Sequence, residues 1–151
     1  MSIVGRFKAL VYVAAVQPDV GESLSDLADK MPPAAKSIEP VGDGFLAVNP
    51  DAFPNDLAAD APEPVARFMA ISQVPVSGDA LKAKATVAAW KQKPSYAVIP
   101  MQDRMINPDL ERFMTKRAQS QIIELPGSHA IFLSHAPEVA ALMEKAAAAA
   151  Q

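Results

Sequence analysis

Cysteine is absent from the 151 residues of this chain. Its absence excludes disulfide bonds, a thiolate nucleophile, and zinc or iron–sulfur sites that depend on cysteine ligands. Histidine is scarce as well, with 2 residues, so we expect no metal site and no cofactor. Basic residues are not in excess, since 14 Lys and Arg stand against 17 Asp and Glu for a formal net charge of −3. A chain without a basic face has little with which to displace the counterions of nucleic acid, so no nucleic-acid partner is expected.

Long apolar runs are missing too. No run approaches the roughly 20 residues that a membrane-spanning helix needs, and no membrane partner is expected. The nearest candidate, residues 9–16, follows Arg6 and Lys8 and resembles the apolar core of a signal peptide. A turn at residues 17–21 ends that run at once, which favours a buried strand over a signal peptide. The sequence therefore predicts a cytoplasmic protein.

Half of the residues, 50%, are hydrophobic and 21% are charged. This balance and the chain length are typical of one soluble domain, so we expect residues 1–151 to form a single unit. Three apolar runs, at residues 9–16, 95–101 and 121–125, predict short strands. The first two are continuously apolar, as parallel strands covered on both faces are. Helical patterns follow the second and third runs, and the whole predicts an α/β fold of three parallel strands flanked by helices.

The segment from about residue 19 to residue 91 is much longer than a connection between parallel strands needs. Ser23 begins a capping signature for a short helix, and Pro62 stands at the start of another. Residues 82–91 predict a further helix that carries Trp90. The segment is therefore expected to form a mostly helical cap over one end of the sheet.

Two polar residues stand just beyond predicted strands, Asp103 after the second and His129 after the third. The carboxyl ends of neighbouring parallel strands meet at one sheet edge, where functional residues of such sheets concentrate. A carboxylate there can hold an imidazole in its working tautomer. The alternative is that Asp103 only caps a turn and that His129 is a structural residue of a loop.

With these residues in place, the chain resembles the carboxyl-terminal half of an α/β-hydrolase of the esterase-like group with a small helical cap. The resemblance runs through residues 9–23, 72–75, 90–106 and 127–135. It implies a partial α/β-hydrolase fold with a cap insert, and hydrolysis of carboxylic esters or similar acyl substrates by a Ser-His-Asp mechanism. By matching position it implies that Asp103 is the triad acid and His129 the general base.

The chain departs from the resembled family in its nucleophile. The family carries its serine on a Gly-x-Ser-x-Gly elbow, which should precede residues 9–16, and no such motif stands there. The nearest approach, around Ser23, lacks the closing glycine and fits a helix cap better. Ser128 is adjacent to His129 in one loop, a poor arrangement for in-line proton transfer. We therefore expect no nucleophile and no oxyanion hole in this chain, and no activity from the chain alone.

Two other functions remain open at this stage, because the missing elbow also fits a protein without chemistry. The chain is then a non-catalytic binding or interaction module, or a truncated gene fragment of a hydrolase. The resemblance also makes residues 10–16 an interior strand, whose free edge would invite pairing with another chain. The expected partners are thus a small acyl or ester substrate, and either a second copy or a separate amino-terminal hydrolase half.

A substrate pocket is expected beneath the cap. Large apolar residues of the cap, together with one methionine after the second strand, are the candidates for a mainly apolar acyl or aromatic pocket. These residues are Phe45, Phe53, Phe68, Trp90 and Met105. For Trp90 the alternative is a packing anchor under the cap, and for Met105 a place in the core.

Overall fold

The structure is a computed structural model that describes residues 7–149. Its main sheet is parallel, with the strand order β1 (Leu10–Val13), β5 (Ser95–Pro100), β6 (Gln121–Leu125). Leu10 pairs with Ser95 at one end of the sheet, and Pro100 pairs with Leu125 at the other. The predicted α/β fold with three parallel strands is confirmed.

The central strand, β5, is the one that the sequence describes best. All six of its residues are buried, as its continuous apolar run predicts. By contrast β6 lies at a sheet edge and is partly exposed, and β1 is only half-buried. The prediction for β1 was also too long, because the strand ends at Val13. Ala14 then adopts a φ of 46°, a left-handed conformation that cannot continue a strand.

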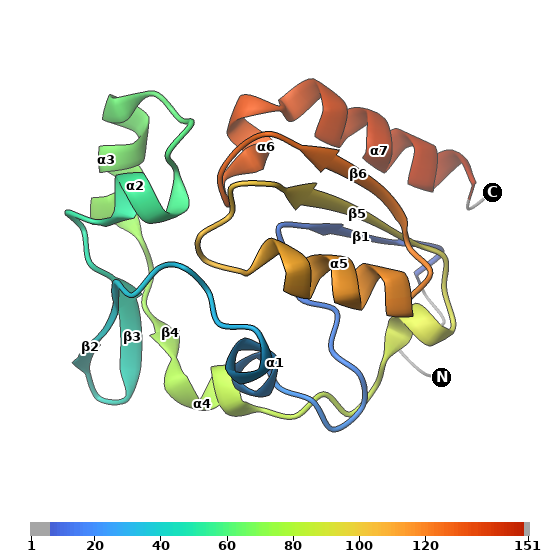
Figure 1. The fold of residues 1–151 in the computed structure, drawn as a ribbon, viewed down its shortest axis with the longest axis horizontal. Coiled ribbons are helices and arrows are strands. Elements are labelled where there is room, and N and C mark those ends of the chain that lie inside the picture. The colour runs from blue at the N-terminus through green and yellow to red at the C-terminus, as the bar shows by residue number, and fades with distance from the viewer. Residues whose placement is uncertain (1–6, 150–151) are drawn as a thin grey trace.

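Helices cover both faces of this sheet (Figure 1). On one face, α7 (Ala136–Ala148) packs Val139 and Leu142 against Tyr96 and Val98 of β5. On the other face lies α5 (Pro108–Arg117), whose Leu110 and Met114 share a core with Leu27. The Asn107 side chain caps the start of α5, since it accepts a hydrogen bond of 2.9 Å from the backbone N–H of Asp109.

In Figure 1 the middle of the insert between β1 and β5 lies to the left of the main sheet, whereas α1 and α4 lie below α5. Its helices are α1 (Leu24–Lys30), α2 (Phe53–Leu57), α3 (Glu63–Ser72) and α4 (Gly78–Lys82). A small antiparallel sheet joins β2 (Ile38–Gly42), β3 (Phe45–Val48) and β4 (Val76–Ser77). The predicted helix starts at Ser23 and near Pro62 are confirmed. The insert was expected to be mostly helical, and it also contains these three strands.

The helix predicted over residues 82–91 is wrong. α4 ends at Lys82, and only a 3₁₀ turn, Ala89–Lys91, follows. The segment between them is held extended by the chain after β1, since Gly21 N–H donates to Ala85 O at 2.8 Å and Ala85 N–H donates to Glu22 O at 2.9 Å. These long-range backbone bonds outweigh the local helix preference of an alanine-rich segment.

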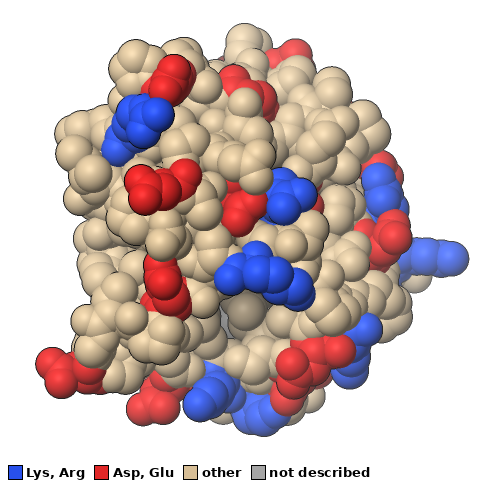
Figure 2. All heavy atoms as spheres, turned by 60° about the vertical axis from the view of Figure 1, so that its left-hand side comes forward, with Lys and Arg blue, Asp and Glu red and all other residues tan. Residues whose placement is uncertain are grey.

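The surface carries charges of both signs. On the face that Figure 2 shows, acidic and basic side chains are interspersed, and neither sign gathers into one large patch. Within residues 7–149, no helix combines the length and the apolarity that crossing a bilayer requires.

Candidate functional site

Asp103 and His129 come together at the carboxyl edge of the parallel sheet. Oδ2 of Asp103 lies 2.7 Å from Nδ1 of His129. The other carboxylate oxygen, Oδ1, accepts the backbone N–H groups of Met105 and Ile106 at 2.7 and 2.9 Å. Asp103 therefore caps the turn after β5 and is also hydrogen-bonded to the imidazole. Its side chain is fully buried, whereas a quarter of the His129 side chain, 25%, is exposed.

This contact decides which imidazole nitrogen is free. A carboxylate only accepts hydrogen bonds, so Nδ1 of His129 carries the hydrogen that faces Asp103. The other nitrogen, Nε2, makes no hydrogen bond within residues 7–149 and holds the lone pair of the neutral ring. His129 is thus oriented as a base with its accepting nitrogen directed away from the carboxylate.

The loops that carry these two residues are tied to each other. Met101 N–H donates to Leu125 O at 2.9 Å, which continues the β5–β6 pairing by one step. Next along the chain, Gln102 N–H donates to Gly127 O at 3.0 Å, and Gly127 N–H donates to the Gln102 side-chain oxygen. The acid loop and the base loop therefore leave the sheet as a bonded pair, which sets the distance between the two side chains.

A buried acid stands beside this pair. Glu111 of α5 is 1% exposed. Burial, and next the nearby charge of Asp103, raise the pKa of the Glu111 carboxyl to about 9, although a hydrogen bond from the Ala15 backbone N–H acts to lower it. Its Oε2 has no hydrogen-bond partner among the described residues. Glu111 is accordingly protonated and neutral at pH 7, and it adds no second negative charge behind Asp103.

A second carboxylate anchors the acid loop to the cap. Asp56 of α2 accepts a hydrogen bond of 2.8 Å from Nε of Arg104, the residue after Asp103. Burial of Asp56 by itself would raise its pKa, but the hydrogen bonds from Ser37 and Arg104 outweigh burial and hold the pKa below its ordinary value. The ion pair is therefore charged at neutral pH and fixes α2 to the turn that contains Asp103.

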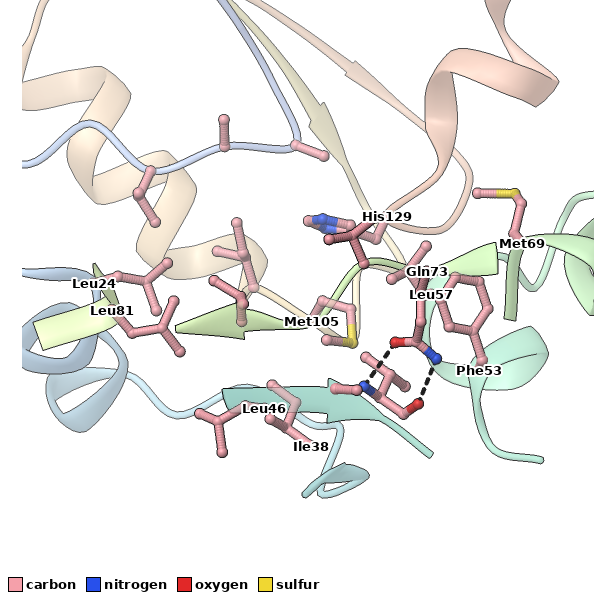
Figure 3. Close-up of a pocket in the computed structure, with 18 of the residues that line it drawn as sticks. Leu24, Ile38, Leu46, Phe53, Leu57, Met69, Gln73, Leu81, Met105 and His129 are labelled. Atoms are coloured by element: carbon pink, nitrogen blue, oxygen red, sulfur yellow. Dashed lines mark hydrogen bonds between the residues drawn. The ribbon is translucent and has the colours of Figure 1, made fainter. Parts of the chain in front are cut away.

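A cavity of about 700 Å³ opens beside His129, between the sheet edge and the cap (Figure 3). Its described lining has no Asp, Glu, Lys or Arg, and its polar members are Ser72, Gln73 and His129. The Gln73 amide is occupied, since it accepts from Val48 N–H at 2.9 Å and donates to Val48 O at 2.7 Å (dashed in Figure 3). The Ser72 hydroxyl donates to Phe68 O of its own helix at 2.8 Å. Among the described residues, His129 thus supplies the polar group left free to meet a ligand.

Two of the five predicted pocket residues, Met105 and Phe53, line this cavity. Phe45 and Phe68 do not, because they point outward with 43% and 66% of their surface exposed. Trp90 also lies elsewhere, and its Nε1 donates to Pro18 O at 2.9 Å.

The position of each phenylalanine along its strand or helix explains why it does not line the cavity. Phe45 and Phe68 each stand one residue before a residue that does line the cavity, Leu46 in β3 and Met69 in α3. One step along a strand or helix turns a side chain to another face. Trp90 packs against Arg117, whose guanidinium carbon lies 5.4 Å from the ring centroid, so it has the packing role that was its alternative.

Much of the lining that sequence reasoning missed consists of aliphatic residues from α1, β2, β3, α2 and α4. It includes Leu24, Ile38, Leu46, Leu57 and Leu81. The signal available for these residues was the apolar pattern of the insert, but that pattern does not tell which face closes on the cavity.

The serine hydroxyls considered in the sequence are engaged elsewhere. The Ser23 hydroxyl accepts the Asp26 backbone N–H and donates to the Asp26 carboxylate, which makes it the predicted helix cap. The Ser128 hydroxyl donates to Leu57 O at 3.1 Å and to Asp60. Neither hydroxyl is hydrogen-bonded to His129.

His135 has a structural place. It directly precedes α7, and its Nε2 donates to Pro126 O at 2.8 Å. Among residues 7–149, no three His, Asp or Glu side chains group together in a way that would hold a metal ion.

Comparison with known proteins gives one family. A model of the alpha/beta hydrolase family matches residues 2–142. The chain is similar to a solved extracellular alpha/beta-hydrolase from a Paenibacillus species, described as sharing structural and functional homology with tobacco salicylic acid binding protein 2. That structure has a TM-score of 0.74 and 20% identity, over 95% of this chain and 63% of that chain. No curated protein sequence matches.

Two further solved structures are similar in the same way. A pyrethroid hydrolase from Sphingobium faniae JZ-2 has a TM-score of 0.68 and 20% identity, over 93% of this chain and 61% of that chain. A methylesterase from Arabidopsis has a TM-score of 0.64 and 13% identity, over 93% of this chain and 59% of that chain. This chain thus spans about three fifths of the length of these structures. At such low identity the likeness shows a shared fold.

Proposed function

The chain belongs to the alpha/beta hydrolase family, and we propose that it supplies the acid–base pair of a serine hydrolase that cleaves carboxylic esters or similar acyl compounds. One observation carries this proposal. Nδ1 of His129 lies 2.7 Å from the buried Asp103 carboxylate, and the same imidazole lines an apolar cavity. This arrangement matches the base and the orienting acid of a Ser-His-Asp triad.

In the proposed mechanism His129 Nε2 takes the proton of a serine hydroxyl as its oxygen attacks the ester carbonyl. The same nitrogen then returns that proton to the departing alkoxide, so that an alcohol leaves and an acyl-serine remains. In the second step His129 takes a proton from a water molecule whose oxygen attacks the acyl-serine, and it gives that proton to the serine oxygen as the acid departs. Asp103 keeps the hydrogen on Nδ1 throughout and stabilises the imidazolium that forms.

The serine is proposed to come from protein outside these 151 residues. Support comes from the sequence, which contains no Gly-x-Ser-x-Gly elbow, and from the hydroxyls of Ser23 and Ser128, which are bonded to other groups. The backbone donors of an oxyanion hole would come with that elbow, because one of them belongs to the residue after the nucleophile.

The proposed substrate is an uncharged ester with a bulky apolar group, covered by the insert of about residues 19–91. A charged group on the substrate would leave water without gaining a partner, since the described lining has no charged residue and the Gln73 amide is already bonded. Each methylene placed against this lining is worth about 0.8 kcal/mol, or about fourfold in kcat/KM. The similar methylesterase and pyrethroid hydrolase are consistent with this substrate class.

A second candidate is a non-catalytic binding module for apolar molecules. The observation that favours it is the cavity itself, which has about 700 Å³ of space and no free hydroxyl nucleophile among its described lining residues. A binding module would bind apolar esters without hydrolysing them, both as the 151-residue chain and within a longer product.

The test is an assay with chromogenic phenyl esters of increasing acyl length. It compares the 151-residue chain with a longer product that includes a Gly-x-Ser-x-Gly segment. We expect that only the longer product hydrolyses the esters and that its kcat/KM rises with acyl length. His129→Ala in the longer product should lower kcat by about 10⁴-fold or more. His135→Ala, which changes the other histidine of the sequence, serves as the control.

Three outcomes would contradict the proposal. Turnover that survives His129→Ala refutes the base. His129-dependent turnover by the 151-residue chain alone refutes the external serine. Binding of apolar esters with no turnover by the longer product favours the non-catalytic module.

A further inference from the structure

The loop that carries His129 is bonded to the cap as well as to the sheet. Asp60 lies in the cap between α2 and α3, and its carboxylate accepts hydrogen bonds from the hydroxyls of Ser128 and Ser134. Ser128 is buried and directly precedes His129. Ser134 ends the short helix α6 (Ile131–Ser134) that follows His129. One cap carboxylate therefore holds the chain on both sides of the histidine.

The backbone of α2 reinforces this contact. The carbonyl oxygen of Leu57 accepts the N–H of Ala130 at 2.9 Å and the hydroxyl of Ser128 at 3.1 Å. Ser128 and Ala130 are the immediate neighbours of His129, so one cap carbonyl binds the side chain before the histidine and the backbone N–H after it.

Close packing at Gly127 shows how near Asp60 lies. A Cβ atom added to Gly127 would lie 2.5 Å from Oδ2 of Asp60 and 2.4 Å from Cδ1 of Ile131. The carboxylate thus rests against the backbone of the histidine loop, and a side chain at position 127 would have to displace it. Asp60 itself is exposed on its outer side, so this contact is made by the carboxylate end of the residue.

The charge of Asp60 suits this role. Burial acts to raise its pKa, but the hydrogen bonds from Ser128 and Ser134 outweigh burial and keep the pKa below its ordinary value. The carboxylate is ionised at neutral pH, and hydrogen bonds to an ionised acceptor are stronger than those between neutral groups.

We propose that Asp60 is a positioning residue for His129. Asp103 orients the ring through Nδ1, while Asp60 and the Leu57 carbonyl fix the backbone from which the ring projects into the cavity. The cap thereby sets the direction of Nε2 as well as covering the substrate. The kinetic part of this inference rests on the proposed function, but the placement of the histidine loop does not.

The test uses Asp60→Ala with a matched control, Asp51→Ala, which removes another exposed aspartate of the same cap. Proton NMR measures solvent exchange of the His129 Nδ1 hydrogen and of the Ala130 amide. We expect both to exchange at least tenfold faster in Asp60→Ala and at an unchanged rate in Asp51→Ala. In the esterase assay kcat falls about tenfold or more with KM nearly unchanged, because a displaced base slows chemistry more than binding.

Conservative variants keep the proposal open to refutation if Asp60→Ala fails to fold. Asp60→Asn retains an acceptor oxygen, and its amide can donate to the second serine oxygen, so we expect it to restore kcat to within about threefold. Ser128→Ala removes one of the two hydroxyl contacts and should reproduce part of the faster exchange.

Two results would overturn the proposal. One is unchanged exchange of the His129 and Ala130 hydrogens in folded Asp60→Ala or Ser128→Ala. The other is an Asp60→Ala variant that melts at a lower temperature but has the same kcat as Asp51→Ala. That result would mean that Asp60 only stabilises the fold. A longer product, with the Gly-x-Ser-x-Gly segment, that shows no esterase activity would refute the proposed function, while the exchange rates would still decide the role of Asp60.

Discussion

Replacement of Glu111 by glutamine should make the protein more stable at neutral pH. Glu111 is buried beside the charged Asp103, and burial raises the pKa of its carboxyl to about 9 from the ordinary value of 4.5. In the folded protein the group is protonated at pH 7, whereas in the unfolded chain it is ionised. Glutamine has nearly the same shape and no proton to lose, so Glu111→Gln removes this difference between the two states.

The magnitude follows from the difference in pKa. Below pH 4.5 the carboxyl is protonated in both states, so it adds no pH dependence. Between pH 4.5 and 9 the folded protein keeps a proton that the unfolded chain releases, so the free energy of unfolding falls as pH rises, by about 1.4 kcal/mol per unit. The loss is about 3 kcal/mol at pH 7 and levels off near about 6 kcal/mol above pH 9.

Urea unfolding at pH 4.5, 7 and 8.5 measures this effect. At pH 4.5 we expect Glu111→Gln to lie within about 1 kcal/mol of the unchanged protein, since both then carry a neutral group at the same unpartnered place. At pH 7 and 8.5 the variant should be more stable by about 3 and 5 kcal/mol. Glu144→Gln, at an exposed glutamate of α7, is the control and should show no such gain. Equal pH slopes for Glu111→Gln and the unchanged protein would mean that Glu111 is ionised in the fold, and the reasoning would fail.

Two further predictions concern packing and association. Gly127→Ala should destabilise the protein by about 1–3 kcal/mol in thermal unfolding, because its Cβ would meet Ile131 Cδ1 at 2.4 Å and the bonded Asp60 carboxylate at 2.5 Å; an unchanged melting temperature would contradict the packing around Asp60. The 151-residue chain should associate with copies of itself, because β1 (Leu10–Val13) pairs only with β5 among the described residues and has no proline or charge along its free edge. Light scattering over a dilution series that gives 16.0 kDa at every concentration would rule this out.

Elements with local signals were predictable from the sequence. β5 has a continuous apolar run, and α5 begins with an Asn–Pro pair that caps its first turn. The errors lie where distant segments decide the backbone. The end of β1 depends on the left-handed turn at Ala14, and residues 83–88 form no helix because Ala85 bonds to the chain near Gly21. No local pattern marks either of these.

At the site, too, the residues with a local sequence signal were predictable and the others were not. Asp103 and His129 follow apolar strands directly, and parallel strands bring their ends to one edge, so the pair was predictable. The pocket was harder, because the choice of Phe45 and Phe68 used side-chain size and disregarded direction. Leu46 and Met69, their immediate neighbours, have the face that meets the cavity.

Asp60 had no sequence signal, because it stands in an alanine-rich loop of the cap, 69 positions before His129. Asp60 reaches the histidine loop because the cap is inserted between β1 and β5 and its α2–α3 loop lies at the carboxyl edge of the sheet. Asp56 makes the matching contact to Arg104 on the acid loop. One short cap segment therefore bonds to the loops of both Asp103 and His129, so a substrate that shifts α2 would move the acid and the base together.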